Sequence, residues 1–170
     1  MGIPVAARWC KFSPATMNNG FVQRGGWWVV GQFLLLFAIA IFGITCRATS
    51  KLHLIFLAGV VFLLASAICG ISGALALGRN LTPFPKPSAN SQFVQHGIYA
   101  LIRHPLYTAV FFAAVGWSLV WQSWPALVVS LALAFFFDAK ARHEERWLRQ
   151  QFADYAGYER RVRRFIPWIY

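Results

Sequence analysis

Two long runs of apolar residues stand in the first half of the chain. Residues 27–46 form a stretch of 20 residues without one charged side chain, and residues 52–77 form a second run with only His53 at its edge. A helix of about 20 apolar residues is long enough to cross the roughly 30 Å apolar core of a bilayer. The pattern therefore predicts two transmembrane helices within residues 27–77.

Two shorter apolar runs follow, at residues 105–121 and 125–139. The sequence at their junction, QSWP, favours a tight turn, so residues 105–141 are predicted to form a helical hairpin. The four runs together predict an all-α integral membrane protein, a bundle of four transmembrane helices. A fifth span is expected if the long second run breaks at Gly70 or Gly73.

The polar segments complete the predicted organisation of a single membrane domain. Residues 1–26 are mixed in character and are expected to form a cytoplasmic lead-in. Residues 78–104 contain three prolines at alternate positions, which exclude regular helix, and are expected to form a cytoplasmic loop. Residues 142–170 carry apolar side chains at helical spacing among many basic ones, which predicts an amphipathic cytoplasmic helix along the membrane interface.

The basic residues are distributed unevenly along this predicted topology. The chain has 16 Lys and Arg against 5 Asp and Glu, a net charge of +11 that could also suit nucleic acid. With four spans, however, 14 of the 16 fall on one side, and only Arg47 and Lys51 fall on the other. By the positive-inside rule both termini are predicted to be cytoplasmic. The basic excess is therefore expected to contact anionic membrane lipids, and nucleic acid is not a predicted partner.

The sequence lacks the short motifs of several other functional classes. Its three cysteines, Cys10, Cys46 and Cys69, form no CxxC pair and no metal-ligand spacing, so no metal site is predicted. No GxGxxG follows a predicted strand, which argues against a nucleotide site of the soluble dinucleotide-binding type.

The acidic residues are confined to one short segment. The first 137 residues contain no carboxylate side chain. Chemistry that needs a carboxylate must therefore recruit it from the last part of the chain. The acidic residues are Asp138, Glu144, Glu145, Asp154 and Glu159.

The predicted hairpin brings this acidic segment to a basic one. If each leg has about 17 residues at 1.5 Å per residue, the chain returns near residues 142–145 to the level of Arg103 and His104, about 10 Å away. Pro105 suits the first turn of a helix, whose free N–H groups bind anions. Arg103 adds a fork of donors for a carboxylate or phosphate. The pattern predicts a site for a ligand with an anionic end and a cationic centre.

Ordinary structural explanations remain open for each of these residues. Arg103 also marks the basic boundary of a span. Glu145 with Arg149, and Asp138 with Arg142, have the i, i+4 spacing of common helix-surface ion pairs. The joint placement of these charges at one depth is what favours a site.

The residues of these two clusters are similar to a known family. GIYALIRHPLYTA and, about forty residues later, EERWLRQQFADYAGYERRVRRFIP resemble the isoprenylcysteine carboxyl methyltransferases and related phospholipid methyltransferases. The shared pattern is G-x-Y-x-x-x-R-H-P-x-Y, then E-E-x-x-L-x-x-x-F, Y-x-x-Y and R-x-x-P. The likeness covers about residues 77–167, and LGRNLTPFPKP looks like the loop before the motif in small bacterial members. The chain departs from the pattern after Phe152, where glycine is usual.

This resemblance implies a methyltransferase of the bacterial cytoplasmic membrane that uses S-adenosylmethionine, held by the RHP hairpin and the C-terminal helix. It implies an amphiphilic or lipid-modified acceptor, such as an isoprenylcysteine. The residues it implies as catalytic are Arg103, His104 and Glu144. The residues it implies as cofactor-binding are Tyr99, Arg103, His104, Pro105, Tyr107, Arg142, Glu144, Glu145 and Leu148.

Several functions stay open at this point. An acceptor carboxylate needs no general base, whereas the amine of a phospholipid acceptor would need one, with His104 or a glutamate as the candidate. Sterol-reductase-like oxidoreductases that use NADPH also carry an RHP-Y element and a similar C-terminal segment. A non-catalytic membrane subunit is the third alternative.

Overall fold

The computed structural model describes residues 25–49, 52–82, 84 and 93–167. Nearly all of the predicted lead-in, residues 1–26, lies outside the described residues. The three prolines of the predicted loop, at positions 83, 85 and 87, and residues 168–170 lie outside them too.

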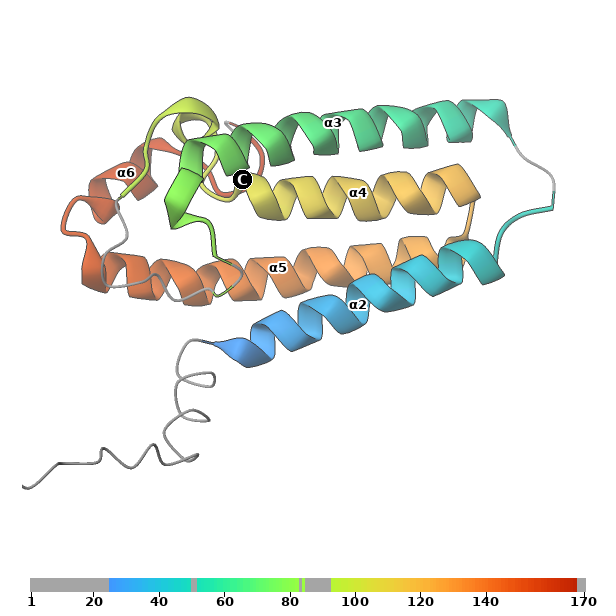
Figure 1. Cartoon of the computed structure of the whole chain (residues 1–170), viewed down its shortest axis with the longest axis horizontal. Helices are drawn as coiled ribbons and strands as arrows, with labels where there is room; N and C mark the ends of the chain where they lie inside the picture. The colour runs from blue at the N-terminus through green and yellow to red at the C-terminus, as the bar shows by residue number, and fades with distance from the viewer. Residues whose placement is uncertain (1–24, 50–51, 83, 85–92, 168–170) are drawn as a thin grey trace, which may run out of the picture.

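The described residues form only helices, turns and short extended segments, as predicted. Four helices lie side by side along the long axis of the molecule (Figure 1). They are α2 (Gly26–Thr45), α3 (His53–Leu77), α4 (Pro105–Trp121) and α5 (Trp124–Gln151). The 3₁₀ turns η1 (Gly78–Asn80) and η2 (Gly97–Ala100) and the short helix α6 (Tyr155–Arg161) gather at one end.

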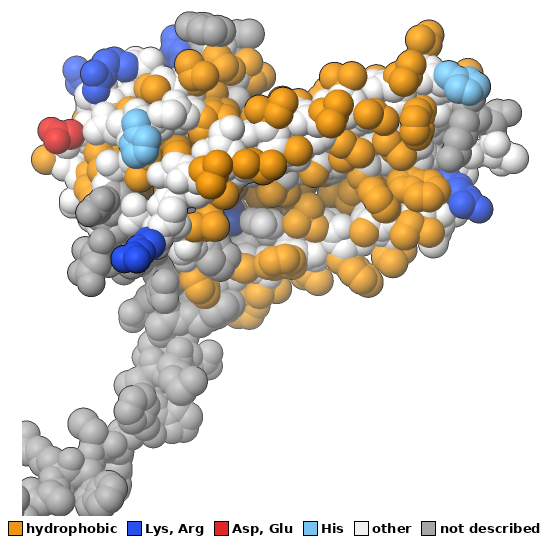
Figure 2. Space-filling view, turned by 45° about the horizontal axis from the view of Figure 1, so that its top comes forward, with side chains coloured by type: hydrophobic (Ala, Val, Ile, Leu, Met, Phe, Trp, Pro, Cys, Tyr) orange, Lys and Arg blue, Asp and Glu red, His pale blue; other side chains and the backbone are white. Residues whose placement is uncertain are grey.

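Three of these helices are long and apolar enough to cross a membrane: α2, α3 with its continuation η1, and α5. The fourth, α4, is apolar but has only 17 residues. Apolar side chains cover the outside of the bundle along its length, and charged side chains lie at its two ends (Figure 2). This surface is typical of an integral membrane protein. Helix α3 is continuous through Gly70 and Gly73, so it contains no break that would give a fifth span.

The predicted hairpin between α4 and α5 is present. Gln122 ends α4 in a left-handed conformation with φ 52°, and the hydroxyl of Ser123 accepts a hydrogen bond from the backbone N–H of Ala126 at 3.4 Å. The side chain of Gln122 also bonds both backbone polar groups of Leu52, at 3.0 and 2.9 Å. The turn therefore fixes the α4–α5 pair and ties it to the beginning of α3.

Glycines set the distance between α3 and α4. A Cβ atom added at Gly59 would lie 2.8 Å from the backbone N of Val120 and 2.9 Å from the backbone O of Gly116. Contacts this short between fixed backbone atoms require glycine, as in other closely packed membrane helices. At the other end of the pair, a Cβ atom added at Gly73 would lie 3.1 Å from Leu106 and 3.3 Å from Pro105, so the beginning of α4 lies against the end of α3.

The C-terminal segment differs from the prediction of one amphipathic helix over residues 142–170. Helix α5 does not end at residue 141 but continues to Gln151, and α6 follows as a separate helix. After α6 the chain is extended, and its bridge between Ile102 and Arg163 joins it to the segment before α4. The physical reason is burial: Tyr155, Tyr158 and Val162 pack inside the protein and not against a membrane surface.

Candidate functional site

The RHP sequence forms a fixed turn between η2 and α4. Helix α4 begins at Pro105, as predicted, with His104 as its N-cap residue. The backbone N–H groups of Arg103 and His104 donate to the carbonyls of Arg163 and Arg164, at 2.8 and 3.1 Å. The extended segment after α6 therefore holds this turn in place by backbone hydrogen bonds.

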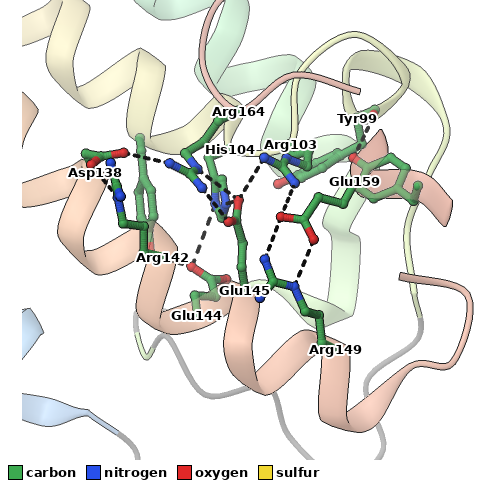
Figure 3. A network of polar contacts seen from close by, with 12 residues as sticks. Tyr99, Arg103, His104, Asp138, Arg142, Glu144, Glu145, Arg149, Glu159 and Arg164 are labelled. Atoms are coloured by element: carbon green, nitrogen blue, oxygen red, sulfur yellow. Dashed lines mark hydrogen bonds and ion pairs between the residues drawn. The ribbon is translucent and has the colours of Figure 1, made fainter. Parts of the chain in front are cut away.

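The turn and the acidic segment of α5 are in direct contact. Nε2 of His104 lies 3.1 Å from Oε1 of Glu145, and Nη2 of Arg103 lies 3.3 Å from the same oxygen. Figure 3 shows these side chains facing one another across the turn. The prediction that the RHP turn and the acidic segment, about forty residues apart in the sequence, lie close together is confirmed. Their side chains are in direct contact, whereas a separation of about one helix diameter was expected.

Glu145 is the centre of a buried ion-pair cluster behind the turn. Its side chain is only 1% exposed, and besides Arg103 and His104 it accepts hydrogen bonds from Arg164 at 3.0 and 2.7 Å. Arg164 also donates to Asp138 at 2.8 Å. Burial opposes the positive charge of Arg164, but the bonds and charges of Glu145 and Asp138 outweigh it and raise the pKa of Arg164. A buried carboxylate needs such partners, since its desolvation is costly.

Glu159 of α6 extends the ion-pair cluster on the other side of Arg103. It accepts two hydrogen bonds from Arg149, at 2.8 and 2.7 Å. Nη1 of Arg103 lies 2.9 Å from Glu159, a charge contact in which the N–H direction is not aligned for a hydrogen bond. The bonds from Arg149, together with the charge of Arg103, hold the pKa of Glu159 below its ordinary value. Arg103 is thus held between two carboxylates.

A cavity of about 210 Å³ lies beside the ion-pair cluster, between the RHP turn and the ends of α3, α4, α5 and α6. Several predicted site residues line it, and others do not. The predicted residues that line the cavity are Tyr99, Arg103, His104, Tyr107, Glu144 and Leu148. Those that do not are Pro105, Arg142 and Glu145.

Among the described residues that line this cavity, Glu144 is the only acidic one. Its Oε2 accepts a hydrogen bond from the Tyr107 hydroxyl at 2.7 Å and lies 3.8 Å from Nδ1 of His104. The Tyr107 ring is stacked between those of His104 and Phe137, with centroids 5.2 and 4.9 Å away. This stack fixes the hydroxyl that positions the Glu144 carboxylate at the cavity wall.

Aromatic side chains form the wall near α6. Phe93 stacks on Phe152 with centroids 5.2 Å apart, and the Tyr158 hydroxyl donates to the carbonyl of Tyr99 at 2.6 Å. Tyr155 is 1% exposed, and burial first, then the charge of Glu145, raises the pKa of its hydroxyl, which stays protonated at neutral pH. Flat faces of this kind suit the ring system of a ligand.

Three buried polar atoms of cavity-lining residues have no hydrogen-bond partner among the described residues. They are the hydroxyl of Tyr155 and Nε and Nη1 of Arg103, of which Nη1 has the charge contact with Glu159. A buried donor without a partner costs free energy, so such atoms indicate groups that a bound molecule would satisfy.

The structure also adds residues that the sequence-based prediction did not include. Lys140 lines the cavity one helical turn before Glu144, and Gln32 of α2 lines it beside Lys140. Two features of the sequence could have pointed to these residues as members of the site. Lys140 has the i, i+4 spacing from Glu144 that places both on one face of a helix, and Gln32 is an isolated amide in an apolar run. Tyr155 and Tyr158 are the two tyrosines of the Y-x-x-Y sequence.

Arg142 lies away from the cavity. Its side chain is 63% exposed and forms an i, i+4 ion pair with Asp138 at 2.7 Å. This pair is the ordinary structural explanation that the sequence offered for Arg142, as opposed to a role in cofactor binding. The other helix-surface pair that the sequence suggested, Glu145 with Arg149, is not formed. Arg149 of α5 pairs instead with Glu159 of α6.

The chain is similar to known proteins over a large part of its length. The family described as phospholipid methyltransferase matches residues 54–155. The cobalt-zinc-cadmium resistance protein CzcN of Cupriavidus metallidurans is 35% identical over 46% of this chain and 37% of its own. A probable protein-S-isoprenylcysteine O-methyltransferase of Oryza sativa subsp. indica is 28% identical over 65% of this chain and 60% of its own. The chain therefore spans between about a third and three fifths of these relatives.

A solved structure has the same fold. The eukaryotic intramembrane Ras methyltransferase ICMT (isoprenylcysteine carboxyl methyltransferase) aligns with a TM-score of 0.63 at 23% sequence identity. The alignment covers 93% of this chain and 54% of that chain. The described helices, including α4, are thus arranged as in an intramembrane protein.

Proposed function

The chain belongs to the phospholipid methyltransferase family, and on this premise we propose that it is a membrane enzyme that transfers a methyl group from S-adenosylmethionine to the polar head of a lipid-like acceptor. The observation that carries the proposal is the cavity between the RHP turn and Glu144, with an aromatic wall and with buried donors of Arg103 and Tyr155 that have no hydrogen-bond partner among the described residues. The methyltransferase relatives favour this reaction over NADPH-dependent reduction.

The residues of the cavity fit the cofactor by chemical type. Glu144 offers a carboxylate to its cationic centre, and the aromatic wall offers flat faces to its purine ring. Tyr155 and Arg103 supply donors that are without partners among the described residues. When bound, the cofactor supplies the electrophilic methyl group. The proposed cofactor-binding residues are Tyr99, Arg103, His104, Tyr107, Glu144, Leu148, Tyr155 and Tyr158.

The three residues expected to be catalytic have different proposed tasks. Glu144, whose carboxylate is held by the Tyr107 hydroxyl and lies 3.8 Å from Nδ1 of His104, would face the cationic centre of the bound cofactor and orient it without overstabilising it. Arg103 and Glu145 fix each other, which makes Glu145 a positioning residue. Because the Glu145 carboxylate accepts hydrogen bonds, Nε2 of His104 donates and its Nδ1 is left as the acceptor. His104 is thus the base available for an acceptor that must lose a proton.

The proposed topology has four spans with both termini in the cytoplasm. Helix α4 has 17 residues, or about 26 Å at 1.5 Å per residue, slightly less than the bilayer core. It packs between α3 and α5, so its ends can lie within the protein and not in lipid. The cavity is at the end that holds most of the basic residues, which the positive-inside rule assigns to the cytoplasm. In a bacterial cell this would be the cytoplasmic membrane.

Binding measurements on the purified full chain in detergent test the proposal. We expect S-adenosylhomocysteine to bind in calorimetry and NADPH not to bind. Mass spectrometry of lipid extracts from expressing cells should reveal a species heavier by one methylene, about 14 Da. Failure of both the S-adenosylhomocysteine titration and the lipid assay would overturn the proposed function. NADPH binding alone would favour a reductase.

A further inference from the structure

Lys140 is a buried cation in the wall of the cavity. Its side chain is 1% exposed, and its Nζ donates to the Gln32 amide oxygen at 2.6 Å. The same nitrogen lies 4.9 Å from the centroid of the Tyr107 ring. Among the described residues it forms no ion pair within 4.0 Å. The direct partners of this buried ammonium group are therefore a neutral amide and a ring face, and the Glu144 carboxylate, one helical turn away, acts on it only from beyond ion-pair distance.

The other charged groups of the cavity are already engaged. Arg103 contacts Glu145 and Glu159, and His104 contacts Glu145. Glu144 accepts from the Tyr107 hydroxyl. Lys140, which has three donors and uses one for Gln32, is therefore the cation best able to bind an incoming anion.

Lys140 lies on the membrane side of the cavity. It precedes Glu144 by one turn of α5, about 6 Å closer to the bilayer centre in the proposed topology. The cavity residues around it come from transmembrane helices: Gln32 from α2 and Leu106 and Val110 from α4. The aromatic wall and the unsatisfied Tyr155 hydroxyl lie toward α6, the water side. An acceptor arriving from the bilayer would therefore meet Lys140 first.

We propose that Lys140 binds the carboxylate head of the methyl acceptor and so selects an anionic acceptor over an amine-headed one. The proposal rests on the proposed function. In the step it implies, a carboxylate oxygen forms a bond to the methyl carbon while the methyl–sulfur bond breaks and its electron pair stays on sulfur. The acceptor becomes a neutral methyl ester, the donor a neutral thioether, and no proton moves. The ester no longer pairs with Lys140, which favours product release.

The test compares two amphiphiles that differ only in their head group: N-acetyl-S-farnesylcysteine and its carboxamide. Binding of each to the full chain in nanodiscs is measured by calorimetry. For the wild type we expect the carboxylate to bind at least about tenfold more tightly than the amide, because it forms a charge-assisted bond. Lys140→Met should remove this preference, and Lys140→Arg should keep most of it. The carboxamide should bind with similar affinity to the wild type and to both variants.

Two controls separate this role from others. Arg146→Met removes an exposed cation of the same helix outside the cavity lining and should leave the preference unchanged. Lys140→Met removes a buried charge, which is favourable, but leaves the Gln32 amide oxygen without this donor, which is not, so the variant should melt within a few degrees of the wild-type temperature. If Lys140→Met unfolds, Lys140→Gln takes its place in the same comparison.

The outcomes distinguish the proposal from the proposed function. Equal binding of the two amphiphiles to the wild type, including no binding of either, would overturn the role of Lys140. The role would also be overturned if Lys140→Met kept the preference, or lost affinity for S-adenosylhomocysteine, which would assign the lysine to the cofactor. A wild type that prefers the carboxylate but binds no S-adenosylhomocysteine would instead contradict the proposed function.

Discussion

Glu144 and Glu145 are neighbours in the sequence but belong to different regions of the molecule. Glu144 lines the cavity with the Tyr107 hydroxyl as its partner, whereas Glu145 lies in the ion-pair cluster against Arg103 and Arg164. Consecutive residues of an α-helix point about 100° apart, so one turn of α5 serves both regions. The cluster holds the RHP turn in position, and the cavity wall keeps its polar groups available for a bound molecule.

The largest expected effect comes from removing the charge of Glu145. Glu145→Gln leaves Arg103 and Arg164 buried with weakened partners, which should lower the free energy of unfolding by about 3–5 kcal/mol. The matched variant Glu144→Gln, at the cavity wall, should lower it by less than about 1 kcal/mol. Chemical denaturation in detergent measures both. Similar losses of stability in the two variants would remove the distinction between the regions.

The second effect concerns binding and should appear in the cavity wall alone. Glu144→Gln and Tyr107→Phe should each weaken the binding of S-adenosylmethionine about 10- to 100-fold, since a charged interaction of this kind contributes roughly 1.5–3 kcal/mol. S-adenosylhomocysteine, a neutral thioether without the positive sulfur, should be weakened less. Their melting temperatures should stay near that of the wild type. Calorimetric affinities equal to the wild type in both variants would show that this wall does not contact the cofactor.

The third effect is a small dependence of stability on pH that arises in the ion-pair cluster. The pKa of Glu159 is lower in the folded protein than its ordinary value of about 4.3, so its contribution is complete above that value. The contribution is lost as the pH falls through the depressed pKa. Because Arg149 is partly exposed, the difference in stability between wild type and Glu159→Gln should be below about 1 kcal/mol at pH 7. Melting curves from pH 7 to 3 should show this difference shrinking with acid, and a difference that grew would contradict the sign.

The smallest effect is expected for Arg142, which belongs to neither region. Arg142→Ala removes an exposed i, i+4 pair with Asp138, which should change stability by about 0.5 kcal/mol or less. S-adenosylhomocysteine affinity should be unchanged. A clear loss of affinity in calorimetry would restore the role that the family motif suggested for this arginine.

The sequence predicted the elements of the fold well where one local property decides the outcome. Long apolar runs predicted the helices, the QSWP junction predicted the α4–α5 turn, and Pro105 predicted the first turn of α4. Helix lengths predicted that the RHP turn and residues 142–145 lie at one level about 10 Å apart, and the structure brings them into direct contact. The C-terminal segment was predicted wrongly because an apolar helical spacing looks the same whether it faces a membrane or the interior of a protein.

Within the site, the sequence identified the charged residues but not their partners. It placed Arg103, His104 and both glutamates together, and only the family resemblance, which implied Glu144 and not Glu145 as catalytic, separated the two glutamates. Lys140 and Gln32 come from helices far apart in the sequence, and their contact depends on the packing of α2 against α5.

The amino-acid sequence by itself determined the helices, the hairpin and the end of the bundle at which charges gather, because these follow from hydrophobicity and chain length. Only the tertiary structure decided which carboxylate faces the cavity, which arginines are neutralised and which lysine has no carboxylate in contact with it among the described residues. The reason is that the direction and pairing of a side chain depend on residues brought near it by packing, often from helices distant in the sequence.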